Sequence, residues 1–420
     1  MPMLPAEPIP ALSEDCVPPA IIGVAALTTA AVHGATPAML AAMIERPDAD
    51  PIARLYDAGI AHQLAFRCAE GLELQDQALA ASLLFRVRRD DGDAGCRLLA
   101  LVLPGRLMAN TPLDFITNHL DVRLDLLFVQ PGGALPAGIP DHDIAFFAAG
   151  DADDAMIARL GALFDAWPRP ALNDPRLLPR LARDRLPTLL AGVPGICAPP
   201  AVAASRARLD ALLRDGGDIA ALLPGCGYPV LVRPLGSHAG HGLRKLESAK
   251  DLAAYMTFSF APDYYVTAFA DYRSPDGLYR KYRVAFIDRE PFLCHVAASQ
   301  HWMVHYLNAG MTESADKRAD EARAMAQFAV SFAHRHGAAF AALHERLPFD
   351  YYAIDCGETP DGRLLVFEAD TAAIIHLMDP PEMFPYKHVQ MRRVFDAFGA
   401  MLERRGRRVR ASLRDAAAGD

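Results

Sequence analysis

Three carboxylates near the C-terminal end of the sequence, Asp355, Glu368 and Asp370, are the residues best suited to carry chemistry. Asp355 closes an alternating apolar stretch that predicts a strand, and residues 364–370 predict a second strand after a polar turn. Because side chains two apart on a strand share a face, Glu368 and Asp370 point the same way, and a hairpin would bring Asp355 beside them. Such an all-oxygen set suits Mg²⁺ or Mn²⁺. Taken alone, it equally fits three solvated acids on an edge hairpin.

A glycine-rich segment upstream has the character of a phosphate-binding loop. Residues 229–234 are a short apolar strand that contains the cation Arg233, and residues 236–242 follow with three glycines and Ser237. Glycine leaves backbone amides accessible and permits positive φ, which suits contact with phosphate oxygens. The loop matches neither the Walker pattern nor the dinucleotide fingerprint, so alone it is as readily an ordinary hairpin turn. Because the loop precedes the carboxylate hairpin in the sequence, the two motifs together indicate a phosphate-binding site more specifically than the loop does alone.

With these motifs in this order, the sequence resembles the ATP-grasp superfamily, in particular its glutathione-synthetase-like carboxylate–amine ligases. The resemblance covers about residues 170–400. It is carried by residues 173–175, 183–185, 193–200, 229–242, 265–272, 282–287 and the hairpin over 349–370. It implies a two-lobed nucleotide domain, with ATP as a cofactor and Mg²⁺, or alternatively Mn²⁺, as the metal.

The resemblance also implies roles for individual residues. Arg233 and Arg283 are predicted to be catalytic, and Asp355, Glu368 and Asp370 to be metal ligands. The predicted cofactor-binding residues are Arg185, Arg233, Gly236, Ser237, Gly240, Gly242, Phe269 and Asp271. The sequence departs from the family pattern twice, because Arg233 stands where the family usually has lysine and Asp370 where it usually has asparagine. Arginine stays cationic and can hold phosphate with a forked geometry.

A histidine-rich stretch over residues 294–306 lies between the two halves of this pattern. Its imidazoles have near-neutral pKa values in general, so they could bind a substrate carboxylate or accept a proton. The alternative is a half-buried aromatic strand, and the spacing disfavours zinc. The predicted substrate-binding residues are His295, Ser299, His301, Asn308 and Thr371.

The chain as a whole predicts an α/β protein with an α+β ATP-grasp core. Residues 1–95 are expected to be a helical N-terminal segment, and residues 96–172 a small parallel-sheet domain that precedes the nucleotide domain. Residues 173–405 are expected to form the two-lobed ATP-grasp domain, and residues 406–420 a basic polar tail.

Composition narrows the classes of function. The net charge of −9 gives no support for nucleic-acid binding, and no apolar stretch is long enough for a membrane span. The seven scattered cysteines, without a C-x-x-C pair, favour a reducing cytoplasm. The expected partner is a small-molecule or peptide substrate of anionic character, and a homodimer is a compatible assembly.

The function implied by the resemblance is an ATP-dependent ligase. It would activate a substrate carboxylate as an acyl phosphate and join it to an amine. Two alternatives stay open at this point: an ATP-grasp kinase that phosphorylates a small molecule, and a nucleotide-binding regulator without turnover.

Overall fold

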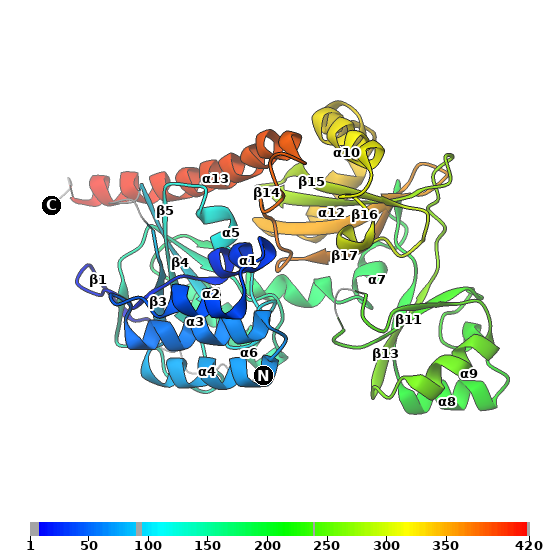
Figure 1. Ribbon diagram of the computed structural model, residues 1–420, viewed down its shortest axis with the longest axis horizontal. Helices are drawn as coiled ribbons and strands as arrows, with labels where there is room; N and C mark the ends of the chain where they lie inside the picture. The colour runs from blue at the N-terminus through cyan, green and yellow to red at the C-terminus, as the bar shows by residue number, and fades with distance from the viewer. Residues whose placement is uncertain (1–7, 90–94, 238–239, 418–420) are drawn as a thin grey trace.

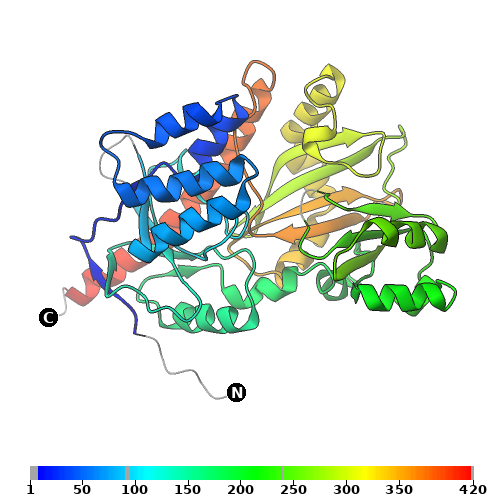
Figure 2. The ribbon, with the colours of Figure 1, turned by 60° about the horizontal axis from the view of Figure 1, so that its bottom comes forward.

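The computed structural model describes residues 8–89, 95–237 and 240–417 and confirms the predicted α/β class. In these residues the strands form sheets of six, five, four and two strands. Figures 1 and 2 show an elongated molecule with the six-stranded sheet and its helices at one end and a small lobe at the other. No helix of the described chain combines the length and the apolar character that crossing a membrane requires.

The six-stranded sheet is built from apolar strands. Residues 98–101 are at most 1% exposed, as a continuous apolar run in a parallel sheet predicts. All neighbouring strands pair in parallel except β3 and β5. The order is β2 (Ala20–Ile21), β3 (Leu84–Val87), β5 (Val122–Phe128), β4 (Cys96–Val102), β7 (Ile144–Phe147) and β8 (Ala171–Leu172). β2 and β3 come from the N-terminal segment, which therefore contributes strands as well as helices. A separate parallel ribbon joins β1 (Ala11–Ser13) to β6 (Gly138–Pro140).

Helices of the N-terminal segment pack beside this sheet (Figure 1). They are α1 (Val24–Val32), α2 (Pro37–Ile44), α3 (Pro51–Leu64) and α4 (Cys68–Ala81), and α5 (Asp114–Thr117) and α6 (Asp154–Ala166) follow. The side chains of Thr36 and Asp50 cap α2 and α3 by accepting first-turn amide hydrogen bonds, each just before a proline. α3 and α4 meet at Gly59 and Gly71, where a Cβ on Gly71 would lie 2.6 Å from the Gly59 carbonyl oxygen.

The small lobe is a four-stranded antiparallel sheet covered by two helices. Its order is β10 (Ala201–Ser205), β13 (Asp263–Ala268), β11 (Val230–Pro234) and β12 (Arg244–Leu246). The helices are α8 (Arg206–Arg214) and α9 (Ala249–Phe258). Its apolar core, which includes Leu209, Val232, Leu252 and Val266, is separate from the main core of the protein.

The five-stranded sheet forms the second lobe. Its order is β15 (Glu290–Ser299), β14 (Tyr279–Ile287), β16 (Tyr351–Glu358), β17 (Leu364–Asp370) and β9 (Ile196–Cys197). The helices of this lobe are α7 (Leu186–Leu190), α10 (Ala315–Gln327), α11 (Phe332–Arg335) and α12 (Gly337–Arg346). Short 3₁₀ helices occur along the chain at Pro175–Leu181, Ile219–Ala221, Tyr306–Asn308 and Phe328–Val330. The predicted carboxylate hairpin is the β16–β17 pair. Together with the small lobe, this sheet gives the two-lobed arrangement that the ATP-grasp resemblance implies for the fold.

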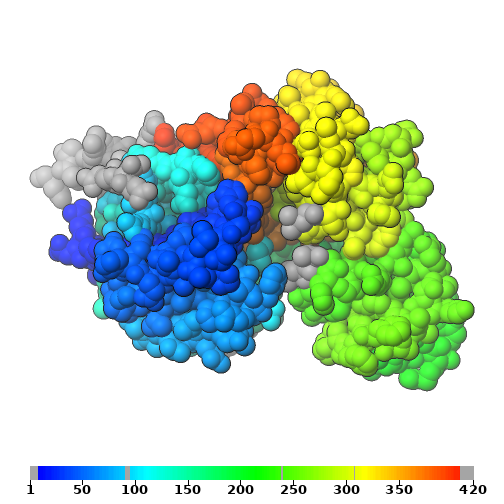
Figure 3. Space-filling model, viewed as in Figure 1, coloured from blue at the N-terminus to red at the C-terminus, as the bar shows by residue number. Residues whose placement is uncertain are grey.

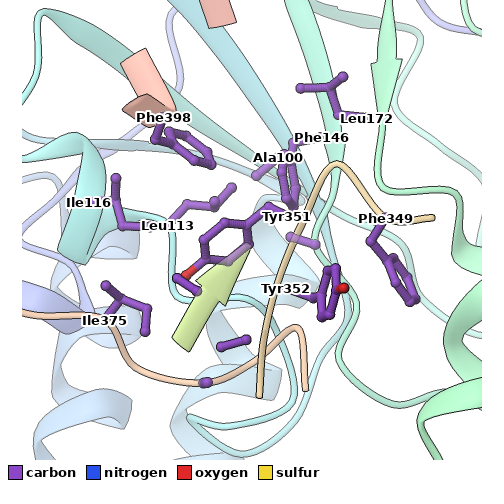
Figure 4. Close-up of a cluster of buried hydrophobic side chains, with 14 of the residues drawn as sticks. Ala100, Leu113, Ile116, Phe146, Leu172, Phe349, Tyr351, Tyr352, Ile375 and Phe398 are labelled. Carbon is purple, nitrogen blue, oxygen red and sulfur yellow. The ribbon is translucent and has the colours of Figure 1, made fainter. Parts of the chain in front are cut away.

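One hydrophobic core joins the five-stranded lobe to the N-terminal sheet. Figure 4 shows Tyr351 of β16 beside Phe146 of β7 and Phe398 of α13 (Pro385–Ala417), with ring centroids 6.4 and 5.5 Å from that of Tyr351. One turn earlier in α13, Phe395 stacks on His119 at 4.5 Å between ring centroids. Aromatic pairs of this kind add to the free energy of burial. They therefore hold the two parts in a fixed relation.

Candidate active site

A cavity of about 590 Å³ lies between the two lobes. Its lining comes from the small-lobe strands β11 and β13, from β14 to β17, and from the loops over 302–308 and 373–379. Figure 3 shows the molecular surface hollowed between the green small lobe and the blue N-terminal part. The volume lies within the range of about 300–1,000 Å³ that is usual for small-molecule sites.

Four polar side chains, called here the polar row, cross the five-stranded sheet on the cavity side. The strand register places His295 beside Arg283, Arg283 beside Asp355, and Asp355 beside Glu368. Directly opposed residues on neighbouring strands share a face, and all four line the cavity. Asp370, two residues after Glu368, lines it as well. The hairpin thus brings the three predicted carboxylates to one face of the sheet.

Asp355 is held by two cations. Its Oδ1 accepts from Arg283 Nε at 2.8 Å, and its Oδ2 accepts from Arg283 Nη2 at 3.0 Å and from Lys281 Nζ at 2.9 Å. The Asp355 side chain is only 4% exposed. Burial alone would raise the pKa of Asp355, but the adjacent charges of Arg283 and Lys281 hold it well below its usual range. The three-residue cluster is therefore ionised and carries a net charge of about +1.

Glu368 and Asp370 have a different environment. Glu368 Oε2 accepts a hydrogen bond from Arg183, and Asp370 Oδ1 accepts one from the Ala372 amide at 2.7 Å. Burial raises the pKa of Asp370 to about 6, in spite of the bond from Ala372, and the charge of Glu368 adds to the increase. These two carboxylates are thus less neutralised than Asp355.

The three predicted carboxylates share one face of the sheet but differ in their hydrogen-bond partners. Among the described residues, no group of three or more His, Cys, Asp or Glu side chains is placed to hold a metal ion. The physical reason is that both oxygens of Asp355 accept from Lys281 and Arg283, whose charges would repel a divalent cation. Glu368 and Asp370 each keep one oxygen that no donor of the described chain contacts. Glu368 and Asp370 are therefore the residues that could hold one Mg²⁺ or Mn²⁺.

Two arginines face these carboxylates from elsewhere in the chain. Arg183 and Arg233 both line the cavity, and Arg233 donates to the hydroxyl of Ser237 at 3.1 Å and to its carbonyl. Burial, together with the charge of Arg183, lowers the pKa of Arg233 to about 10. Arg233 is still cationic near pH 7, so the two arginines form a positive wall suited to phosphate.

The three glycines after β11 have the backbone conformation expected of a tight loop. Gly236, Gly240 and Gly242 have φ angles of +72°, +73° and +69°, which side chains with a Cβ rarely adopt. Gly242 also approaches the strand before the loop, since a Cβ there would lie 2.7 Å from Pro234 Cδ. Gly240 lines the cavity, close to Met303 on the opposite lobe.

One end of the cavity is aromatic. Phe269, which follows β13, packs edge-on against Trp302 with ring centroids at 6.0 Å. Lys245 Nζ lies 4.0 Å from the centroid of the Phe269 ring on the small-lobe side. The surrounding lining is apolar and consists of Leu231, Ala268, Tyr272, Leu365 and Phe367. Flat apolar surfaces of this kind suit a heteroaromatic base.

The structure brings part of the predicted site together. The predicted residues that line the cavity are Arg233, Gly240, Phe269, Arg283, His295, Asn308, Asp355, Glu368 and Asp370. The predicted residues that do not line it are Arg185, Gly236, Ser237, Gly242, Asp271, Ser299, His301 and Thr371.

Local structure explains several of these differences. Arg185 lies at the start of α7, whereas Arg183, two residues earlier, reaches Glu368. The Asp271 carboxylate accepts from the Arg273 amide within its own turn at 3.0 Å. The Ser299 hydroxyl accepts from the His301 amide at 3.1 Å, and the buried Thr371 hydroxyl faces the Ala149 carbonyl at 3.5 Å.

Several charged or ionisable residues that line the cavity were not among the predicted site residues. These are Arg183, Lys281, His305, His376 and Lys387. Lys281 lies two residues before Arg283 on β14, so the two-residue period of a strand could have found it. Burial lowers the pKa of His376 to about 4 and also lowers that of His305, which makes both imidazoles neutral near pH 7.

Comparisons with known proteins give likenesses of fold. A VanG D-Ala:D-Ser ligase from Enterococcus faecalis is 14% identical with a TM-score of 0.44, covering 73% of this chain and 99% of its own. A RimK domain ATP-grasp protein from Sphaerobacter thermophilus is 19% identical with a TM-score of 0.38, covering 73% and 98%. A D-alanine–D-alanine ligase from Bacillus anthracis, complexed with ATP, is 12% identical with a TM-score of 0.41, covering 76% and 99%. No family model matches the sequence, and no curated protein matches it.

Proposed function

We propose that this protein is an ATP-dependent carboxylate–amine ligase that works through an acyl phosphate. The observation that carries the proposal is the continuity of one cavity. The aromatic pair of Phe269 and Trp302, the cations Arg183 and Arg233, and the polar row all line this one cavity. These three kinds of surface suit a nucleotide base, its phosphates and a site of phosphoryl transfer.

In the first step, ATP is a substrate whose base would occupy the aromatic compartment. Arg183 and Arg233 would hold its phosphates, and Arg283 would lie beside the γ-phosphoryl group. A carboxylate oxygen of the acid substrate attacks the γ-phosphorus while the bond to the β–γ bridging oxygen breaks, which yields an acyl phosphate and ADP. Fixed cations stabilise the charge that moves to the bridging oxygen during this transfer.

In the second step, an amine attacks the acyl carbon and phosphate leaves. The amine loses one proton, which the leaving phosphate takes up, since the cavity imidazoles of His305 and His376 already accept backbone amide hydrogen bonds from Asn308 and Met378. Gly240 and Met303, which line the cavity from opposite lobes, would help to keep water from the acyl phosphate. Mg²⁺ or Mn²⁺ held by Glu368 and Asp370 would neutralise phosphate charge when bound.

The proposal extends to substrate and location. The cations around the cavity favour an anionic acid or peptide as the substrate, and the scattered cysteines favour a cytoplasmic enzyme.

The test is release of ADP with a panel of amino acids and peptides, with and without hydroxylamine, which converts acyl phosphates to hydroxamates. The variant is Arg283→Gln, and the matched control is Arg280→Gln on the same strand. Arg280 pairs with Asp276 and Asp320 and does not line the cavity. We expect Arg283→Gln to lower the rate of hydroxamate formation about 10²–10³-fold and the control to change it less than about threefold.

Two results would contradict the ligase. ADP together with a stable phosphorylated product, and no hydroxamate, would identify a kinase instead. Nucleotide binding with no ADP from any acid in the panel would favour a regulator without turnover over the ligase.

A further inference from the structure

We infer that Lys281 takes the place of a metal ion at Asp355, so that nucleotide binds with one divalent cation and a protein ammonium group. The inference rests on the proposed nucleotide function and concerns how the site balances phosphate charge. Its basis is geometric: the cation that contacts the first carboxylate of the set is a side chain of this protein.

The position of Lys281 supports this role. Lys281 precedes Arg283 by two residues on β14, so both side chains rise from the same face of the sheet, and both line the cavity. The Lys281 side chain is 15% exposed and its ammonium contacts Asp355 at 2.9 Å. An ammonium group has three donors. Asp355 uses one of them in the described structure, which leaves the others for a phosphate oxygen.

The charges of the site favour one divalent cation over two. Lys281, Arg283 and Asp355 together carry about +1, since a guanidinium and an ammonium outweigh one carboxylate. A divalent cation bound to Asp355 would share its two carboxylate oxygens with Lys281 and Arg283. The positive charges of these two side chains would repel it. Glu368 and Asp370 lie on the side of the row away from Lys281 and keep unbonded oxygens. The divalent cation therefore belongs with that pair.

Asp355 is then a positioning residue. It is buried, both of its oxygens are engaged, and it holds the ammonium and the guanidinium side by side. The two cations would face the transferring phosphoryl group without the need to dehydrate a second metal ion. The two cations differ in geometry, because the Lys281 ammonium is a compact point charge and the Arg283 guanidinium is a planar fork of donors.

The experiment counts metal ions. The full chain is saturated with a non-hydrolysable ATP analogue and titrated with Mn²⁺, and free Mn²⁺ is read by electron paramagnetic resonance. We expect one Mn²⁺ per bound nucleotide in the wild type and two in Lys281→Met, whose cluster is neutral. At low Mn²⁺, we expect Lys281→Met to bind the analogue about tenfold more weakly.

Three further variants separate charge from folding. Lys281→Gln, which keeps a hydrogen-bond donor for Asp355 without the charge, is expected to bind two Mn²⁺ as well. Lys281→Arg restores the charge and is expected to return to one. Lys250→Met on α9, an exposed position outside the cavity, is the matched control and is expected to behave as the wild type.

Two Mn²⁺ per nucleotide in the wild type would overturn the inference. So would a single Mn²⁺ in both Lys281→Met and Lys281→Gln. Failure of the wild type to bind any nucleotide at any Mn²⁺ concentration is a different result, because it would refute the proposed function itself and the inference with it.

Discussion

Replacement of Asp355 by asparagine is predicted to destabilise the protein strongly. The side chain is 4% exposed and accepts three hydrogen bonds, at 2.8, 2.9 and 3.0 Å, from two cations. Asparagine keeps the shape but leaves the ammonium of Lys281 and the guanidinium of Arg283 without a counter-charge. Removal of one partner from a buried ion pair costs about 3–5 kcal/mol. We expect a loss of that size in the free energy of unfolding at pH 7.

The control for this prediction is an exposed ion pair. Asp396 and Arg392 pair on α13 with side chains 58% and 61% exposed, so solvent screens them. Asp396→Asn should cost less than about 1 kcal/mol. Urea unfolding, followed by tryptophan fluorescence in metal-free buffer, measures both variants, and an unchanged dependence on urea concentration shows that the folded state has kept its compactness.

The pH dependence gives a second check on Asp355. Because its pKa is lowered in the folded protein, the carboxylate contributes stability that is fully present above about pH 4, the usual pKa of an unfolded aspartate. That contribution is lost as the pH falls through the folded-state value. The difference between the wild type and Asp355→Asn should therefore be constant from pH 5 to 8 and shrink below pH 4. A difference below about 1 kcal/mol at pH 7 would refute the reasoning.

Three other predictions address the rest of the cavity. Burial raises the pKa of Asp370 to about 6, so ionisation of this carboxyl group opposes folding as the pH rises through that value. In metal-free urea titrations, Asp370→Asn should therefore stabilise the protein at pH 7.5 by up to about 3 kcal/mol and have little effect below pH 4. Arg233→Met should weaken binding of an ATP analogue about 10–100-fold by calorimetry, whereas Arg185→Met, outside the cavity, should change it less than about threefold. Phe269→Ala should cost about 1–3 kcal/mol of adenine nucleotide binding and leave inorganic tripolyphosphate binding unchanged.

Local patterns in the sequence predicted the parts of the site that depend on one strand or one turn. The two-residue period placed Glu368 and Asp370 on one face, and the polar turn after Asp355 indicated the hairpin that aligns Asp355 with Glu368. The same period, applied to β14, would have placed Lys281 with Arg283. Fold class followed from similar reasoning, because apolar runs and glycine-rich turns are local features.

Other parts of the site depend on pairings that no local pattern contains. The ion pairs of Asp355 require β14 and β16 to be neighbours, although helices α10 to α12 separate them in the chain. Arg183 lies in an irregular segment where no periodicity distinguishes it from Arg185. Ser299 ends β15 and Thr371 follows β17, positions that suggested a site, but contacts with backbone groups engage their hydroxyls.

The polar row also bears on how the protein folds. Arg283 and Asp355, which meet across β14 and β16, are 72 residues apart in the chain, so their contact closes a long loop. Closure of such loops is entropically costly, and non-local strand pairing slows folding. The N-terminal helices α3 and α4, which are adjacent in the chain, pack through contacts much closer in sequence. During refolding, the capacity to bind nucleotide should therefore return with the slowest phase, after most of the helical circular dichroism signal has recovered.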